Sequence, residues 1–202
     1  MGAELLQGVS ERVLLRFLRS TGHGDARVVS RDRGGITTGA GVDLAYSAGG
    51  KVVTVKVKPD PYFGTNPVKI QERALVFYRP DAGHYAFEAI SNSLTREPGW
   101  MFSSSADQLF YYFIALDQTE HEVAALYAES DEIFFSELKV ERDELRIIPM
   151  DKLRSWFESN FDPFTPRPVT LGDHSAWFRL IPRADIESAM SDIKTVTPVF
   201  AR

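Results

Sequence analysis

The 202-residue sequence contains no cysteine and only four histidines. The absence of cysteine excludes disulfide bonds, cysteine nucleophiles, thiolate zinc sites and iron–sulfur clusters. Carboxylates and the few histidines remain as metal ligands, so any metal is expected to be a hard cation. The sequence also lacks the run of about 18 apolar residues that a membrane span needs, and it does not begin with the basic and apolar segments of a signal peptide. These absences predict a cytoplasmic protein with no membrane partner.

Basic residues are in short supply as well, since 23 Lys and Arg stand against 28 Asp and Glu, for a net charge of -5. This balance disfavours a protein that simply coats nucleic acid, because such binding neutralises phosphates with a basic surface. The deficit is unevenly distributed. Residues 1–100 carry 13 bases and 10 acids, whereas residues 101–202 carry 10 bases and 18 acids. An anionic partner is therefore expected to bind the first half of the chain.

The sequence predicts a single domain over residues 1–202, because apolar residues are spread along the whole length and no internal repeat is present. A chain of this size can bury a core without crosslinks. We expect a core over 1–160 and a C-terminal strand and helix over 161–202 packed on it. Apolar residues that recur at intervals of three and four predict an amphipathic helix over 5–18, which ends in a glycine turn at 21–24.

The front half continues as short runs with strand character, separated by turn residues. These runs are Arg27–Ser30, Val42–Tyr46, Val52–Lys58, Leu75–Tyr78 and His84–Ile90. The Ala48-Gly49-Gly50 segment predicts a hairpin turn, and Pro59 is expected to end its strand. The pattern indicates one helix followed by an antiparallel meander.

The second half mixes helices and strands. The aromatic run 109–116 predicts either a buried central strand or a buried helix-to-strand segment, after a helical turn capped by Ser105. Helices are predicted over 119–129, 151–157 (capped by Asp151) and 182–193, strands over 133–140 and 144–148, and a proline-rich connection over 162–168 that leads to an apolar run at 177–181. The aromatic residues Trp100, Phe102, Tyr111, Tyr112 and Phe113 are predicted to be core residues. The expected fold is α/β (α+β), a central mixed sheet flanked by helices.

The most informative stretch is residues 41–60, GVDLAYSAGGKVVTVKVKPD. Because side chains alternate along a strand, Lys56 and Lys58 are predicted to share one face. Asp43 lies on the partner strand of the expected hairpin, and Asp60 follows the lysines directly. Each residue also fits a structural role, the lysines on a solvated strand face and the aspartates in turns. Their combination favours a site.

Glu88 adds a further acid from the apolar run YAFEAIS. A carboxylate that projects from the middle of such a strand is costly unless it has a partner. One alternative is a structural ion pair with Lys56 or Lys58 across the sheet. The other is that Glu88 joins Asp43, Asp60 and Lys58 in a functional cluster on adjacent strands.

Three segments carry a resemblance to a known family: GVDLAY around Asp43, TVKVKPD with Lys58 and Asp60, and YAFEAIS with Glu88. The sequence resembles the PD-(D/E)xK nuclease superfamily, particularly its phage and bacterial members. In these a helix leads to a strand with an Asp, a hairpin leads to a strand reading apolar-Glu-apolar-Lys followed closely by Asp, and a later strand carries another acid. The segments PGWMFSSSADQLFYYFIAL, ELRIIPMDKLRSWF and WFRLIPRADIES also resemble that group, so the resemblance covers nearly the whole chain.

The resemblance implies a restriction-endonuclease-like core and a metal-dependent DNA endonuclease that hydrolyses phosphodiester bonds. Asp43, Asp60 and Glu88 would be ligands of Mg²⁺ (or Mn²⁺), because clustered carboxylates repel one another and a divalent cation relieves the repulsion. Lys58 would steady the attacking water or the phosphate. Nucleases of this kind often pair to address two strands, so a homodimer is also expected.

One position departs from the family pattern. Lys56 stands where the family has a metal-binding Glu, and a lysine cannot bind Mg²⁺. Either Glu88 or Asp60 supplies the missing carboxylate and Lys56 contacts a phosphate of the substrate, or the domain no longer cuts and instead binds nucleic acid or a protein partner. Glu11 on the first helix is a further candidate ligand, since that helix borders the site in the family. A third reading is an interaction protein with no nucleic-acid role.

Overall fold

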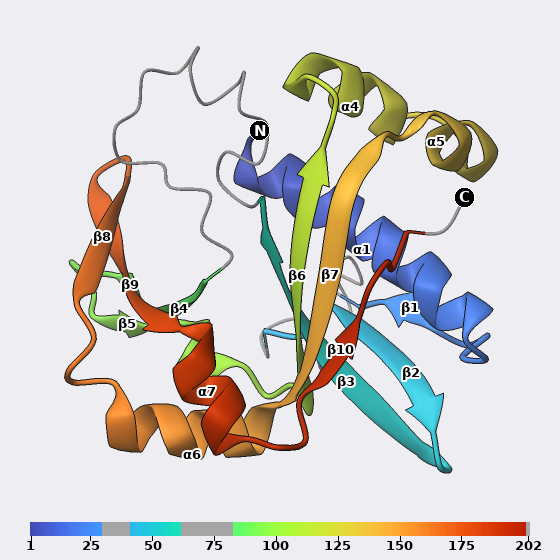
Figure 1. The fold of residues 1–202 in the computed structure, drawn as a ribbon. Coiled ribbons are helices and arrows are strands. Elements are labelled where there is room, and N and C mark those ends of the chain that lie inside the picture. The colour runs from blue at the N-terminus through green and yellow to red at the C-terminus, as the bar shows by residue number, and fades with distance from the viewer. Residues whose placement is uncertain (30–40, 62–82, 201–202) are drawn as a thin grey trace.

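The computed structural model describes residues 1–29, 41–61 and 83–200, which form two β-sheets and the helices around them (Figure 1). The strands of the larger sheet are β1 (Arg27–Val28), β2 (Leu44–Ala48), β3 (Lys51–Asp60), β6 (Gln108–Leu116), β7 (Val140–Pro149) and β10 (Lys194–Val196), in the order β1-β2-β3-β6-β7-β10. The smaller sheet contains β4 (His84–Asn92), β5 (Glu97–Pro98), β8 (Pro166–Leu171) and β9 (His174–Pro182), in the order β5-β4-β9-β8. The predicted α+β class is therefore confirmed.

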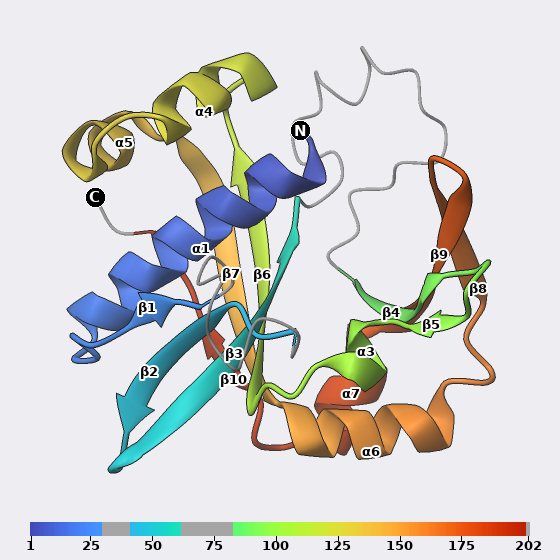
Figure 2. The ribbon, with the colours of Figure 1, turned by 180° about the vertical axis from the view of Figure 1, so that it is seen from behind.

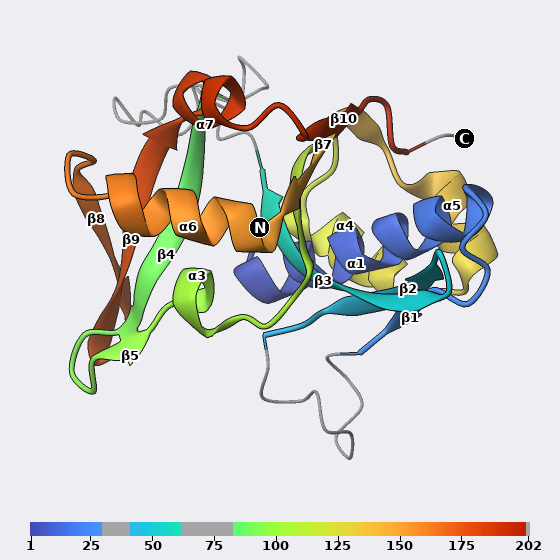
Figure 3. The same cartoon turned by 90° about the horizontal axis from the view of Figure 1, so that it is seen from below.

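The helices cover both faces of the larger sheet. They are α1 (Ala3–Ser20), α3 (Trp100–Ser103), α4 (Glu120–Tyr127), α5 (Asp131–Glu137), α6 (Met150–Asn160) and α7 (Arg183–Ala189). Figure 2 shows α1, α4 and α5 on one side of this sheet. Figure 3 shows the smaller sheet with α6 on the opposite side, so the larger sheet is the middle layer of three. None of the described helices is long and apolar enough to cross a membrane.

The predicted first helix and hairpin are confirmed. The β1, β2 and β3 strands form an antiparallel meander, and the turn between β2 and β3 uses Gly49 and Gly50, both with positive φ (58° and 76°). Positive φ at both central positions matches the twist of a tight hairpin, and glycine adopts it without steric cost. The predicted run Leu75–Tyr78 lies outside the described residues.

Pro59 does not end its strand, contrary to the sequence prediction. The β3 strand continues to Asp60 and pairs in parallel with β6 over its last residues. Backbone groups alternate in direction along a strand, so the nitrogen of Pro59 points to the same side as those of Val55 and Val57, toward β2. Because β2 begins at Leu44, opposite Val55, no strand among the described residues lies there to need an N–H from Pro59.

The aromatic run in the second half forms β6, which confirms the buried central strand and excludes the helix-to-strand alternative. The predicted helical turn at Ser105 is wrong. Instead, Asp107 Oδ2 accepts hydrogen bonds from the backbone N and the Oγ1 of Thr54, both at 2.7 Å. These bonds hold the segment in an extended form beside β3, and the short helix α3 lies before it.

The strand predicted over 133–140 is wrong, because Asp131–Glu137 forms helix α5. The Ser130 side chain accepts a hydrogen bond from the Ile133 N–H, and two acids occupy the first turn, which together favour a helix start. Asp151 is not the cap of α6, since Pro149 holds that position. The predicted last helix is confined to α7, because residues 190–193, which the prediction included in the helix, form a turn before β10.

The proline-rich segment 162–168, predicted to be a connection, lies partly in a strand. Pro166 and Pro168 lie in β8, which pairs with β9 at the edge of the smaller sheet. Proline is tolerated on an edge strand because its missing N–H leaves no ladder hydrogen bond unmade on the open side. The last 40 residues thereby contribute strands to both sheets.

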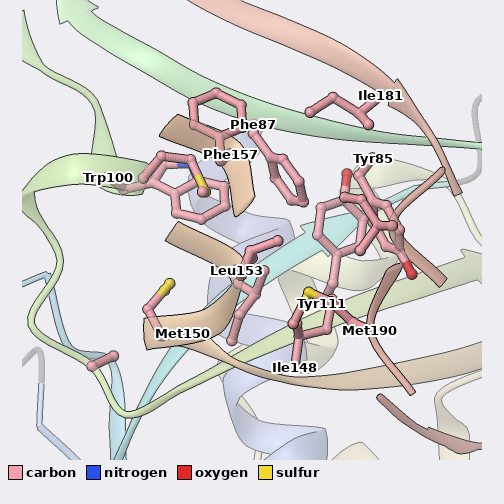
Figure 4. Close-up of a cluster of buried hydrophobic side chains, with 14 of the residues drawn as sticks. Tyr85, Phe87, Trp100, Tyr111, Ile148, Met150, Leu153, Phe157, Ile181 and Met190 are labelled. Carbon is pink, nitrogen blue, oxygen red and sulfur yellow. The ribbon is translucent and has the colours of Figure 1, made fainter. Parts of the chain in front are cut away.

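Two apolar clusters fill the spaces on either side of the larger sheet. The cluster between the sheets contains Tyr85, Phe87, Trp100, Tyr111 and Phe157, as Figure 4 shows. The other cluster lies against α1, α4 and α5. The aromatic residues that the sequence predicts as core are buried, apart from Phe102, which is partly buried against the first cluster.

Arg12 fastens α1 to the turn between α4 and α5. Its guanidinium donates hydrogen bonds to Asp131 Oδ1 (2.7 Å), to the Tyr127 carbonyl (3.1 Å) and to the Glu129 carbonyl (2.8 Å), and it lies 4.1 Å from the centroid of the Phe134 ring.

We expect Arg12→Ala to lower the free energy of unfolding by about 2 kcal/mol, because it removes these hydrogen bonds and the packing of the guanidinium on the ring. Urea unfolding measures the change. Arg16→Ala is the matched control, since Arg16 is exposed one turn later on the same helix. Equal effects of the two substitutions would contradict the assigned role.

Candidate functional site

The β3 strand places Lys56 and Lys58 on the face of the larger sheet that looks toward the smaller sheet. Lys58 pairs with Tyr111 of β6, whose side chain belongs to the cluster between the sheets. Val55 and Val57 are buried on the opposite face, against α1. The alternation predicted from the sequence is thus confirmed.

Lys56 forms an ion pair with Asp43. The Lys56 Nζ lies 3.1 Å from Asp43 Oδ2 and 3.4 Å from Oδ1. Asp43 Oδ2 also accepts a hydrogen bond of 2.7 Å from the Val57 backbone N–H. Asp43 lies just before β2, and its side chain accepts the Val57 N–H that the described strand β2 does not reach. The Lys56 ammonium therefore neutralises Asp43, the first of the predicted metal ligands.

Glu11, on α1, is connected to the same residue of β3, Val57, through the side chain of Gln7. The Gln7 side-chain amide donates to Glu11 Oε1 (2.8 Å) and to the Val57 carbonyl (3.4 Å). The two backbone groups of Val57 thus bind side chains from α1 and from the start of β2. Glu11 is only 4% exposed. The structure thus brings Asp43 to the Val57 N–H directly, and connects Glu11 to the Val57 carbonyl through Gln7.

Lys58, Asp60 and Glu88 form a second group. Desolvation by burial lowers the pKa of Lys58, while the charges of Asp60 and Glu88 oppose this shift and the charge of Lys56 adds to it. The Lys58 Nζ also lies 5.5 Å from the centroid of the Phe178 ring on β9. Phe178 is the residue directly opposite Glu88 in the pairing of β9 with β4. An ammonium on the larger sheet therefore faces a carboxylate and an aromatic ring on the smaller sheet.

Glu88 does not lie on a strand adjacent to β3, contrary to the prediction, because β4 pairs with β9 and β5 in the other sheet. Its Oε2 accepts a hydrogen bond of 3.1 Å from the Trp100 backbone N–H. Gly99 makes this approach possible, since a Cβ there would lie 2.8 Å from Glu88 Cγ and closer still to the Glu88 backbone. The carboxylate is therefore positioned by the start of α3.

Asp60 is positioned by a residue that sequence reasoning assigned only to the core. Tyr111 Oη donates a hydrogen bond of 2.9 Å to Asp60 Oδ2 and accepts one of 2.9 Å from the Ala86 N–H of β4. Gln7 and Phe178 were missed as well. The sequence signal that could have identified Tyr111 is a hydroxyl group within an otherwise apolar run. A buried hydroxyl needs hydrogen-bond partners, so it indicates a polar contact inside the core.

The donor set of the second group suits a hard cation. Asp60 and Glu88 provide carboxylate oxygens, and Mg²⁺ is commonly held by one or two carboxylates together with water and substrate phosphates. Within residues 1–29, 41–61 and 83–200, no group of three or more acidic or histidine side chains is placed to hold a metal ion. A cation here would therefore depend on these two carboxylates and on a substrate.

A scan against protein-family models and searches of curated proteins and of solved structures returned no match to this chain.

Proposed function

We propose that the protein is a metal-dependent phosphodiester hydrolase acting on DNA, with its centre at Lys58, Asp60 and Glu88. One observation carries the proposal: the desolvated Lys58 ammonium lies in the field of two carboxylates that come from different sheets. A partly buried cation beside oxygen donors for a hard metal is suited to stabilise the charge that develops on a phosphate. The resemblance of the surrounding segments to PD-(D/E)xK nucleases supports the same chemistry.

Each residue has a role that its position allows. The Lys58 ammonium can donate to a phosphate oxygen, and its charge acts more strongly where water is largely excluded. Asp60 and Glu88 would hold a divalent cation, which when bound generates a nucleophilic hydroxide from its water and stabilises charge on the scissile phosphate. Asp43 is assigned a different role, since it holds Lys56 and the backbone of β3.

The ion pair between Lys56 and Asp43 favours a second candidate, a nuclease-related domain that binds nucleic acid without cutting it. In this case the ammonium of Lys56 replaces a metal beside Asp43, and the lysines of β3 contact phosphates. Such a domain would bind DNA with an affinity that falls steeply as salt rises.

We expect Glu88→Gln to reduce Mg²⁺- or Mn²⁺-dependent cleavage of DNA by roughly 100-fold or more, because the amide has the shape of the carboxylate but cannot offset a metal's charge. Lys58→Met is expected to have a similar effect. The measurement is the initial rate on end-labelled single- and double-stranded DNA at low salt, with circular dichroism to verify folding.

Glu97→Gln is the matched control, because Glu97 is an exposed acid on β5, beside β4. It should cleave like the unmodified protein. If the unmodified protein binds DNA in a salt-sensitive manner but does not cleave it with either metal, the second candidate replaces the first. An absence of both binding and cleavage would exclude both candidates.

A further inference from the structure

Two tyrosines stand side by side in β6, in the run LFYYFIAL, and both are fully buried. Adjacent strand residues point to opposite faces. Tyr111 faces the cluster between the sheets and Tyr112 faces the cluster against α1. Each hydroxyl donates to a carboxylate, Tyr111 to Asp60 (2.9 Å) and Tyr112 to Asp143 (2.7 Å). The packing volume of either site could be filled by phenylalanine, so the hydroxyls are explained by what they bind.

The Tyr111 hydroxyl joins the two sheets. It donates to Asp60 on β3 and accepts from the Ala86 N–H on β4, two residues before Glu88. Its ring packs edge-on against Tyr85, with centroids 4.9 Å apart. Figure 4 shows the two rings beside each other in this cluster. A tyrosine hydroxyl is protonated at neutral pH, so it is a donor to Asp60.

The structure assigns Tyr111 as a positioning residue that fixes the Asp60 carboxylate relative to the strand that carries Glu88. This assignment rests on the proposed function, because it concerns the same two carboxylates. Asp60 is the last residue of β3, so its carboxylate lies at the end of the strand pairing with β6. Glu88 belongs to the other sheet, whose described strands are hydrogen-bonded in the order β5-β4-β9-β8. The Tyr111 hydroxyl, with one bond to each sheet, therefore fixes the Asp60 carboxylate relative to β4, the strand that carries Glu88.

The test compares Tyr111→Phe with Tyr112→Phe. Both remove one hydroxyl from a buried tyrosine that donates to a carboxylate, so both are expected to lower stability by similar amounts. Only Tyr111→Phe is expected to weaken Mn²⁺ binding, by about 10-fold, since loss of a group that orients a ligand typically costs 10- to 100-fold in affinity or activity. Cleavage by Tyr111→Phe should show a kcat about 10-fold lower with a KM for DNA within 2-fold of the unmodified value.

A third measurement does not depend on metal or activity. The Ala86 amide should exchange its hydrogen faster in Tyr111→Phe, because it loses its acceptor, and should be unaffected in Tyr112→Phe. Unchanged Ala86 exchange, or equal losses of Mn²⁺ affinity in the two variants, would overturn the assignment. If the unmodified protein neither binds Mn²⁺ nor cleaves DNA, the proposed function fails instead, and faster Ala86 exchange alone then decides whether the hydroxyl joins the two strands.

Discussion

Asp143→Ala is expected to lower the free energy of unfolding by roughly 3 kcal/mol or more. Asp143 is 4% exposed, and its carboxylate accepts hydrogen bonds from Tyr112 Oη (2.7 Å), from Val199 N (3.1 Å) and from Phe200 N (2.7 Å). Alanine would leave one hydroxyl and two backbone N–H groups without an acceptor, and each such group costs about 1–3 kcal/mol when buried. The carboxylate also fixes the C-terminal segment, so that segment should become accessible to protease.

Urea unfolding measures this effect, with Glu141→Ala as the control. Glu141 is an exposed acid on the same strand, and its removal should change stability by less than about 0.5 kcal/mol. Asp143→Asn should give an intermediate loss, because the amide keeps one acceptor oxygen but turns a donor toward the N–H groups. A loss below about 1 kcal/mol for Asp143→Ala would show that the C-terminal segment finds other acceptors.

Gly99→Ala is expected to lower the free energy of unfolding by about 3 kcal/mol and to displace Glu88. The added Cβ would lie 2.5 Å from the Glu88 carbonyl carbon and closer still to the carbonyl oxygen, distances that backbone atoms do not tolerate. Overpacking of this kind typically costs about 1–3 kcal/mol. The Gly99 N–H donates to the Ala89 carbonyl (2.9 Å), so the two segments cannot separate without losing this bond.

Thermal and urea unfolding measure the stability of Gly99→Ala, and metal-dependent cleavage measures the effect on Glu88. Gly24→Ala is the matched control, because a Cβ at Gly24 meets no atom within 4 Å. If Gly99→Ala is as stable as Gly24→Ala, then β4 and α3 can move apart, and the close approach does not position Glu88.

Local patterns in the sequence were sufficient for several elements. The amphipathic spacing predicted α1, and the two glycines predicted the β2–β3 turn. Thr119 forms a capping box with Glu122, so the start of α4 also followed from adjacent residues. Alternation along β3 placed Lys56 and Lys58 on one face. In each case the deciding interactions lie within a few residues of one another, and the sequence displays them directly.

Other elements depended on distant partners. The run Ile133-Phe134-Phe135 is compatible with a strand or with a helix, and it is helical because only Phe134 is fully buried, under α1 and α4. Pro166 and Pro168 suggested a loop because β-propensity ignores whether a strand lies at an edge. The pairing of β4 with β9 joins residues about 90 positions apart, and no local signal specifies such a partner.

The sequence by itself therefore determined the absence of thiol chemistry, the α+β class, and the acids and lysines around β3 that could form a site. Only the tertiary structure decided which of these acids and lysines lie together. It paired Lys56 with Asp43, brought Glu88 from a second sheet toward Lys58, and placed the Tyr111 hydroxyl between Asp60 and β4. The physical reason is that a charge or hydroxyl removed from water must find a partner, and that partner is chosen by the packing of whole layers.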